Sequence, residues 1–266
     1  MKTTAIVLAA GSGRRMGTNR PKQYLTIHGK PLLYYSLAAF EKSDVDEILL
    51  VTRREDISYC EEEIVRAYGF EKVAAVIPGG AQRYDSVYQG ILHASGDAVL
   101  IHDGARPCIR TELIQLLVQE LAVTPALVVG VPVKDTIKVT DANGIVTDTP
   151  DRSTLWQVQT PQCFHTARIR EAFERMYEVL NGRSCENPDV RNYENPNARN
   201  YEIPDIRNYE TLNAKTSGKE NVKITDDAMV MECYGSCPVK MIPGSYENIK
   251  VTTREDIRLV ESILAG

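Results

Sequence analysis

Several features of membrane and secreted proteins are missing from this sequence of 266 residues. No apolar run reaches the roughly 18 residues that a bilayer-spanning helix needs. Residues 1–8 read as a strand and lack the layout of a signal peptide. The six cysteines are scattered, and only Cys233 and Cys237 lie close together, with no second pair to complete a zinc site. We therefore expect a cytoplasmic protein with reduced thiols.

The chain also has fewer basic than acidic residues. Lys and Arg number 31 against 36 Asp and Glu, and the resulting net charge of −5 excludes a general nucleic-acid binder. Hydrophobic residues make up 43% and charged residues 25%, which is the balance of a globular protein. The length suits one α/β domain or two small ones, and we predict a single domain over residues 1–266.

The first half of the chain alternates short β-rich runs with amphipathic stretches. The pattern predicts strands at 5–8, 47–51, 73–77, 98–102 and 126–131, and helices at 32–41, 57–68, 86–94 and 113–121. Such alternation predicts an α/β fold, a Rossmann-like and mostly parallel sheet flanked by helices. Ligands of these sheets bind at the carboxyl ends of the strands, so the residues that follow each strand are the first candidates for a site.

Residues 132–158 have a different character. Two polar β-branched runs flank Asn143-Gly144, which is a strong hairpin signal. The hairpin is too polar for a core, so we expect a β-arm that projects from the sheet. Because a two-stranded arm is marginally stable alone, packing against a second copy of the chain is the preferred interpretation. A surface hairpin without a partner is the alternative.

The C-terminal part predicts helices at 166–180, 226–234 and 255–264, and strands at 239–242 and 249–251. Between them, residues 183–218 hold three tandem octapeptides, NPDVRNYE, NPNARNYE and IPDIRNYE, over 187–210. A proline in every unit fits neither a helix nor a core strand. We interpret 183–218 as an exposed low-complexity insert, with a lid or a partner-docking element as the alternative.

A glycine-rich loop, Gly11-Ser12-Gly13-Arg14-Arg15-Met16-Gly17, follows the first strand directly. It lacks the Gly-Lys-Ser/Thr of a P-loop, and its glycines are spaced one residue too widely for a dinucleotide fingerprint. Two arginines, followed by Pro21-Lys22, favour a polyanion such as a nucleoside triphosphate. The alternative is a solvated basic turn.

The loop and Pro21-Lys22-Gln23-Tyr24-Leu25 resemble the signature of nucleotidyltransferases that couple polyol phosphates to nucleotides. Further matching segments are 79–87, 102–107, 151–152, 159–162, 224–227 and 248–252. As a set and in this order, they resemble the 2-C-methyl-D-erythritol 4-phosphate cytidylyltransferase family of the non-mevalonate isoprenoid pathway. One departure is Gly104, where the family usually has alanine; a glycine keeps the backbone close to the ligand, so we expect function to survive.

The resemblance implies a reaction and a set of site residues. CTP and the polyol phosphate would give 4-diphosphocytidyl-2-C-methyl-D-erythritol and pyrophosphate by in-line attack, with Mg²⁺ bound mainly through the CTP phosphates and no assigned metal ligand. The implied catalytic residues are Arg15, Lys22, Arg152 and Lys250; nucleotide would be bound by Ala9, Ala10, Gly11, Ser12, Gly13, Gly79, Gly80, Ser86 and Asp103, and substrate by Arg106, Thr136 and Thr225. His102 is interpreted as structural, and a helix N-cap is the alternative for Asp103.

Two other functions are compatible with parts of the pattern. The ribitol-5-phosphate cytidylyltransferases share the scaffold, but they tend to have Thr-Arg at Arg14-Arg15 and Arg-Asp-His at Asp151-Arg152-Ser153. A non-catalytic nucleotide-binding protein would keep the glycine-rich loop, yet it has no reason to keep Arg15, Lys22, Arg152 and Lys250 together.

The insert yields a first prediction. Replacing residues 187–210 with a short Gly-Ser linker should leave kcat/KM within a few-fold and the melting temperature nearly unchanged, because the cost of closing a surface loop grows only logarithmically with its length. Steady-state kinetics and thermal unfolding of the two chains check this. A ten-fold or larger loss of kcat/KM, about 1.4 kcal/mol, with the fold intact would make the repeat part of the active site.

Overall fold

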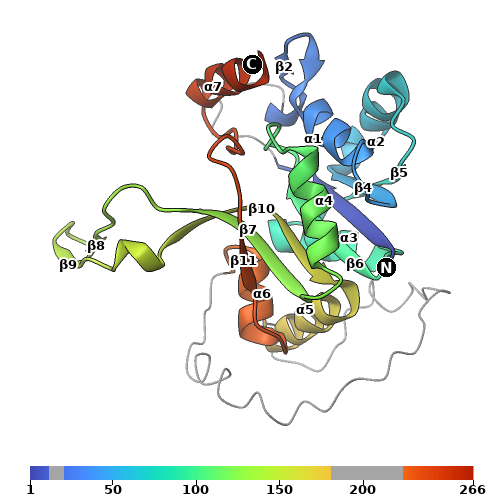
Figure 1. The fold of residues 1–266 in the computed structure, drawn as a ribbon. Helices are drawn as coiled ribbons and strands as arrows, with labels where there is room; N and C mark the ends of the chain where they lie inside the picture. The colour runs from blue at the N-terminus through green and yellow to red at the C-terminus, as the bar shows by residue number, and fades with distance from the viewer. Residues whose placement is uncertain (12–20, 181–223, 266) are drawn as a thin grey trace.

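The computed structural model describes residues 1–11, 21–180 and 224–265. Its centre is a seven-stranded sheet with the order β11-β7-β10-β6-β1-β4-β5 (Figure 1). The strands are β1 (Thr3–Leu8), β4 (Glu47–Thr52), β5 (Val73–Pro78), β6 (Ala98–Asp103), β7 (Ala126–Pro132), β10 (Trp156–His165) and β11 (Lys240–Pro243). In this sheet β10 runs antiparallel to both of its neighbours, whereas the other pairings are parallel. The predicted Rossmann-like, mostly parallel sheet is confirmed.

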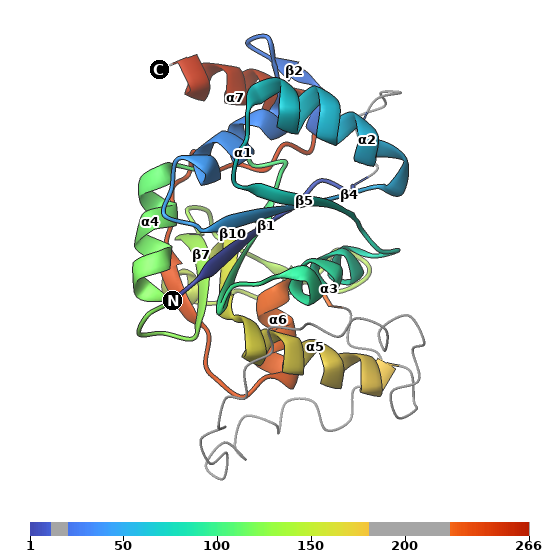
Figure 2. The same cartoon turned by 90° about the vertical axis from the view of Figure 1, so that its right-hand side faces the viewer.

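Helices cover both faces of the sheet (Figure 2). One face carries α1 (Leu32–Glu41), α2 (Ile57–Cys60) and α4 (Thr111–Glu120), and the other carries α3 (Arg83–His93), α5 (Thr166–Leu180) and α6 (Asp227–Tyr234). The C-terminal α7 (Arg254–Ala265) lies near the small hairpin of β2 (Thr26–Ile27) and β3 (Lys30–Pro31), where Val260 and Ile27 share a third buried cluster.

The alternation of side chains along β1 explains why its sequence is apolar from Ala5 to Leu8. Ala5 and Val7 belong to the core under α1 and α4, whereas Ile6 belongs to the core under α3 and α5. All three are fully buried. A parallel strand with both faces covered needs a continuous apolar run, which is the pattern that identified these strands in the sequence.

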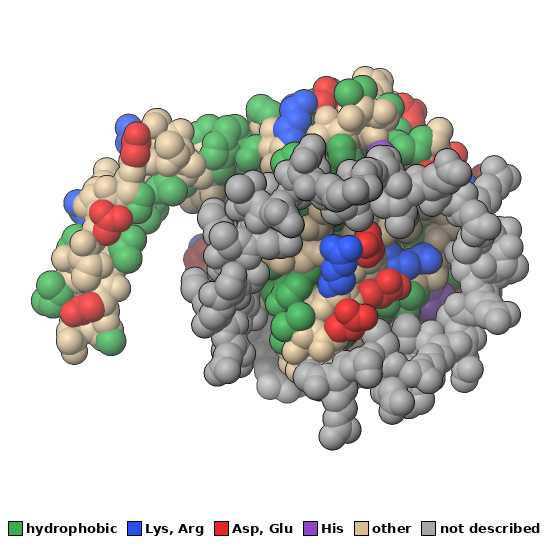
Figure 3. Space-filling view, turned by 90° about the horizontal axis from the view of Figure 1, so that it is seen from below, with side chains coloured by type: hydrophobic (Ala, Val, Ile, Leu, Met, Phe, Trp, Pro, Cys, Tyr) green, Lys and Arg blue, Asp and Glu red, His purple; other side chains and the backbone are tan. Residues whose placement is uncertain are grey.

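An arm leaves the sheet after β7 and returns through β10 (Figure 1). It holds the short strands β8 (Val139–Thr140) and β9 (Val146–Asp148) and one 3₁₀ turn, Arg152–Thr154. The arm stands away from the body and presents hydrophobic and charged side chains together (Figure 3). Val139, Ile145 and Val146 are exposed on it, at 44%, 64% and 53%. The projection agrees with the predicted fold class; the boundaries 132–158 stay a prediction.

Three features of the chain differ from the expectations. The ten-residue strand β10 was not predicted, because Gln157, Gln159 and Thr160 make its first half largely polar and a proline follows at position 161. The predicted strand at 249–251 is wrong: the segment crosses the ends of the strands, and Val251 N donates to Ala105 O in the loop after β6. The predicted helix at 57–68 is α2 followed by a π-helical stretch, Glu61–Arg66.

No helix in the described part of the chain combines the length and the apolar character needed to cross a membrane. The predicted insert, 183–218, falls entirely outside the described ranges, as do residues 12–17 of the glycine-rich loop.

The unpredicted strand gives a stability prediction. Phe164 is fully buried in β10 within the α3–α5 core, so Phe164→Ala should lower the free energy of unfolding by about 3–5 kcal/mol. Urea unfolding measures the difference. Leu116→Ala is the control, since Leu116 is 42% exposed on α4. Equal small losses for both variants would mean that β10 does not close the core.

Candidate active site

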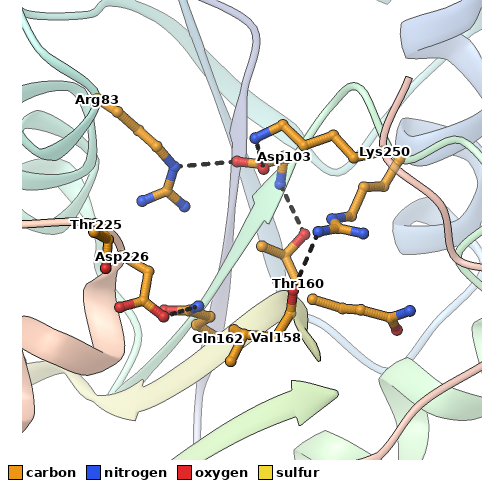
Figure 4. Close-up of a pocket in the computed structure, with 10 residues that line it drawn as sticks. Arg83, Asp103, Val158, Thr160, Gln162, Thr225, Asp226 and Lys250 are labelled. Atoms are coloured by element: carbon orange, nitrogen blue, oxygen red, sulfur yellow. Dashed lines mark hydrogen bonds and ion pairs between the residues drawn. The ribbon is translucent and has the colours of Figure 1, made fainter. Parts of the chain in front are cut away.

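A cavity of about 340 Å³ opens at the carboxyl ends of the parallel strands. β6 ends there at Asp103, and the antiparallel β10 brings its first half to the same edge, where Trp156 pairs with Pro132 at the end of β7. The lining residues are Arg83, Asp103, Arg106, Val158, Gln159, Thr160, Gln162, Thr225, Asp226 and Lys250 (Figure 4). Three of them are cations, so the cavity is suited to an anionic ligand.

Asp103 lies at the centre of this group (Figure 4). Lys250 Nζ donates to Asp103 Oδ2 at 2.6 Å, and Arg83 Nε donates to Oδ1 at 3.3 Å. The backbone N–H of Asp103 donates to Thr160 Oγ1 at 3.1 Å, which ties the end of β6 to β10. Both carboxylate oxygens therefore face cations.

The ion pairs continue into the protein. Arg83, the first residue of α3, directs its two terminal nitrogens at Asp227, the first residue of α6, at 2.9 and 3.0 Å. Asp227 is fully buried. Lys250, Asp103, Arg83 and Asp227 thus form a row of alternating charges that connects four separate parts of the chain.

The charges in this row set one another's protonation. Burial alone would favour the neutral carboxyl of Asp103, but Arg83 and Lys250 hold its pKa well below the ordinary value. Burial opposes the charge of Arg83 as well, yet Asp227 and Asp103 raise the pKa of its guanidinium. Asp103 is therefore a carboxylate and Arg83 a cation at neutral pH.

Arg106 holds the segment before Lys250 against β10. Its guanidinium donates to Asn248 O at 2.7 Å and to Val158 O at 3.5 Å. Asn248 in turn donates from Nδ2 to Thr160 O at 2.8 Å. These bonds fix residues 248–250, which form no β-sheet hydrogen bonds of their own, and so they determine where Lys250 enters the cavity.

Gln162 holds the start of α6 against β10. Its Oε1 accepts the backbone N–H groups of Asp227 and Ala228 at 2.9 and 2.8 Å, and its Nε2 donates to Asp226 Oδ2 at 3.0 Å. Asp226 is also the N-cap of α6, since its side chain accepts from Met229 N. The first N–H groups of the helix are thereby satisfied, and Thr225 is held at the rim of the cavity.

The start of the glycine-rich loop lies beside β6, because Leu8 at the end of β1 pairs with Asp103. Gln23, which is buried, donates from Nε2 to Ala9 O at 2.5 Å and to Gly11 O at 3.1 Å. The neighbouring Lys22 Nζ donates to Val251 O at 2.7 Å, next to Lys250. Lys22 and Lys250 therefore flank the same region.

The loop after β5 lies against the loop after β1. A Cβ atom added to Gly79 would lie 2.8 Å from Ala10 Cβ and 2.7 Å from Ser86 Oγ, so this contact requires glycine. Gly80 N donates to Ser86 Oγ at 3.1 Å. Gly104, the departure noted in the sequence, faces Leu33, whose Cδ1 would lie 2.7 Å from an added Cβ. An alanine there would require Leu33 to shift.

The structure brings some of the expected residues together and not others. Asp103, Arg106, Thr225 and Lys250 line the cavity, with Lys22 beside them. Thr136 and Arg152 lie on the exposed arm, where Arg152 donates to Lys134 O at 2.8 Å. Ser12, Gly13 and Arg15 lie outside the described residues.

The sequence-based selection omitted Arg83, Gln162 and Asp227. Each stands inside a segment that carried the family resemblance, so a signal was present. The expected site residues were those able to contact phosphate. Gln162 and Asp227 instead hold other residues in place.

His102 is fully buried and bonds to Thr160 Oγ1 at 3.0 Å and to Arg106 O at 3.2 Å, which supports its structural interpretation. Among the described residues, no group of three or more His, Cys, Asp or Glu side chains is placed to hold a metal ion.

A Rossmann-like sheet, with a glycine-rich sequence after β1 and a cationic cavity at the strand ends, is the architecture of a nucleotidyltransferase. Comparison with known proteins narrows this class. The family model of IspD, 2-C-methyl-D-erythritol 4-phosphate cytidylyltransferase, matches residues 3–185 and 203–266. The chain belongs to this family. The interval between the matches holds the first two octapeptides, and the third lies within the matched part.

Individual relatives agree with the family match. The 2-C-methyl-D-erythritol 4-phosphate cytidylyltransferase of Lachnospira eligens is 43% identical over 265 residues, which are 99% of each chain. That of Lachnoclostridium phytofermentans is 40% identical over 264 residues, 99% of this chain and 96% of the relative. The crystal structure of 4-diphosphocytidyl-2C-methyl-D-erythritol synthase from Anaerococcus prevotii superimposes with a TM-score of 0.75 at 26% identity, covering 100% of this chain and 96% of that one.

The buried histidine gives a pH prediction. Burial lowers the pKa of His102 from 6.5 to about 4, so between these values the unfolded chain takes up a proton that the folded chain does not. The free energy of unfolding should therefore fall on acidification through this window, with His102 contributing up to about 3 kcal/mol.

Urea unfolding of the wild type and of His102→Gln at pH 7 and pH 4.5 checks this. We expect a flatter pH dependence in the variant, which cannot take up this proton. The same slope in both proteins would show that His102 titrates normally in the folded state.

Proposed function

We propose that the chain catalyses cytidylyl transfer from CTP to 2-C-methyl-D-erythritol 4-phosphate, in the cytoplasm and within a single domain. The products are 4-diphosphocytidyl-2-C-methyl-D-erythritol and pyrophosphate. The observation that carries the proposal is the row of charges around Asp103, which presents Lys250 and Arg83 in a cavity at the carboxyl ends of the strands. Family membership supplies the identity of the two substrates.

The chemistry needs no nucleophile or base from the protein. An oxygen of the polyol phosphate attacks the α-phosphorus of CTP, the bond from that phosphorus to the bridging β-phosphate oxygen breaks, and pyrophosphate leaves. The attacking phosphate is already largely ionised at neutral pH, since its second pKa is about 6. Catalysis then consists of alignment and stabilisation of the spreading negative charge, which positioned cations provide.

The nucleotide side of the site is assigned to the strand ends beside β1. Ala9, Ala10 and Gly11 would offer backbone amides to the phosphates, and the expected Ser12, Gly13 and Arg15 continue this loop outside the described residues. Gly79, Gly80 and Ser86 would bind the cytosine base. Because Gly79 packs closely against Ala10 and has no side chain, the base would contact the backbone of this loop. Lys22 would contact the triphosphate.

The polyol phosphate side is assigned to the cavity. Lys250 would bind the attacking phosphate, because its ammonium is held at the cavity by Asp103. Arg106 and Thr225 also line the cavity and would contact the polyol, and Asp103 would accept from a hydroxyl.

Thr136 and Arg152 enter the proposal through a second copy of the chain. Both lie on an arm with exposed apolar side chains, away from the cavity of their own chain. Pairing of two arms would cover these side chains and bring Thr136 and Arg152 to the partner's site. We therefore propose a homodimer whose sites are completed across the interface.

Magnesium is proposed with a limited role for the protein. Both oxygens of Asp103 face cations, and the described residues provide no cage of carboxylates. The ion would be held by the CTP phosphates and water, where it would neutralise phosphate charge.

Release of pyrophosphate on incubation with CTP and Mg²⁺ tests the activity. We expect release with 2-C-methyl-D-erythritol 4-phosphate and little with ribitol 5-phosphate. Equal release with both would overturn the substrate assignment, and none with either would overturn the proposed reaction.

The dimer gives a further prediction. Arg15→Ala and Arg152→Ala chains should each be nearly inactive, because each loses a cation that stabilises the transition state, typically worth about 10²–10³ in rate. Mixing them should restore part of the activity, since one of the two sites in a mixed dimer then carries both arginines. No recovery, under conditions in which labelled subunits demonstrably exchange, would mean that each site is complete within one chain.

A further inference from the structure

Asp227 is a buried carboxylate that does not line the cavity. Its side chain is fully buried at the first position of α6, and its oxygens accept both terminal nitrogens of Arg83 at 2.9 and 3.0 Å. A buried carboxylate is costly unless it is paired and hydrogen-bonded. Asp227 is too deep to touch a ligand in the cavity, so any effect on the reaction must pass through Arg83.

The arrangement fixes the orientation of the Arg83 guanidinium. With both terminal nitrogens bonded to Asp227, the third nitrogen, Nε, donates to Asp103 Oδ1 at 3.3 Å. Lys250 Nζ then has Asp103 Oδ2 to itself, at 2.6 Å. Arg83 and Asp227 stand at the first positions of α3 and α6, so rigid elements hold the geometry.

We infer that Asp227 is a positioning residue: by engaging the terminal nitrogens of Arg83, it keeps Arg83 from taking both oxygens of Asp103 and so leaves Lys250 placed to meet the substrate phosphate. The inference rests on the proposed function, and it adds a residue that contacts neither substrate.

Removal of the Asp227 charge should redirect Arg83. A guanidinium prefers a bidentate pair with a carboxylate, and Asp103 is the carboxylate that Arg83 already contacts. Arg83 would then claim both oxygens of Asp103 and displace Lys250. Binding of the polyol phosphate should suffer, whereas the CTP loops after β1 and β5 keep their own contacts.

The test compares the variant Asp227→Asn with the double variant Asp227→Asn/Arg83→Met. We expect Asp227→Asn to raise the KM for 2-C-methyl-D-erythritol 4-phosphate by about ten-fold or more and the KM for CTP by less than about three-fold, because misplacing one contact group costs transition-state alignment. In the double variant no guanidinium competes for Asp103, so the KM for the polyol phosphate should recover part of the way.

This recovery separates positioning from a structural role. If Asp227 only anchored α6 and Thr225, removing Arg83 as well could not relieve the defect, and the double variant would match the single variant or be worse. Either result, or a rise of both KM values in parallel, overturns the inference. Glu120→Gln/Lys240→Met removes a surface ion pair between α4 and β11 and serves as the matched control, with unchanged kinetics.

Folding and the proposed function are checked in the same series. Losing one partner of a buried ion pair is destabilising, whereas losing both is often tolerated, so melting temperatures accompany the kinetics. If Asp227→Asn alone does not fold, the double variant decides: a polyol-phosphate KM within about three-fold of the wild-type value supports the inference, because Asp103 is then free to hold Lys250, and a KM raised by about ten-fold or more overturns it. A wild-type chain that releases no pyrophosphate overturns the proposed function and, with it, the inference.

Discussion

The carboxylate of Asp103 accepts hydrogen bonds from Lys250 and Arg83, which are separated by more than half the length of the chain. The site depends on this contact because Lys250 comes from a segment without a strand or helix of its own. Asp103 stands at the end of a fully buried strand, where neither its backbone nor its charge can move freely. The opposing cations keep it ionised in a position where burial alone would favour the neutral acid. One anchored anion thus places Lys250 for an anionic substrate.

The antiparallel strand β10 links this anchor to the arm. Its second half pairs with β6 in the core, and its first half follows β7 out of the body to the arm that carries Thr136 and Arg152. Between the two halves, Thr160 accepts from Asp103 N, and Gln162 holds the start of α6. Because β10 runs opposite to β6 and β7, its N-terminal half lies at the edge of the sheet where the parallel strands have their C-terminal ends. The proposed second copy of the chain would therefore act on a site that β10 has already assembled.

Periodicity was enough to predict the parallel strands and their helices, since a strand such as β1, whose two faces are both covered, carries a continuous apolar run, here from Ala5 to Leu8. It failed for β10, where polar residues serve the site, and for residues 249–251, where Val251 is buried against the loop after β6 and not within a sheet. The family resemblance predicted Asp103, Arg106, Thr225 and Lys250, and the structure brings them to one cavity. Arg83 and Asp227 lie in segments that carried the resemblance, but they were not selected, because their ion pair becomes evident only from the packing of α3 against α6.

A double-mutant cycle on Asp103 and Lys250 tests the anchoring role of Asp103 most directly. The kcat/KM for the polyol phosphate would be measured at saturating CTP for the wild type, Asp103→Asn, Lys250→Met and the double variant. If Asp103 acts by holding Lys250, Asp103→Asn should lower kcat/KM far less in the Lys250→Met background than in the wild type. The coupling free energy should then be at least about 1 kcal/mol. Additive effects, within about 0.3–0.5 kcal/mol, would contradict the account and show that the two residues act independently.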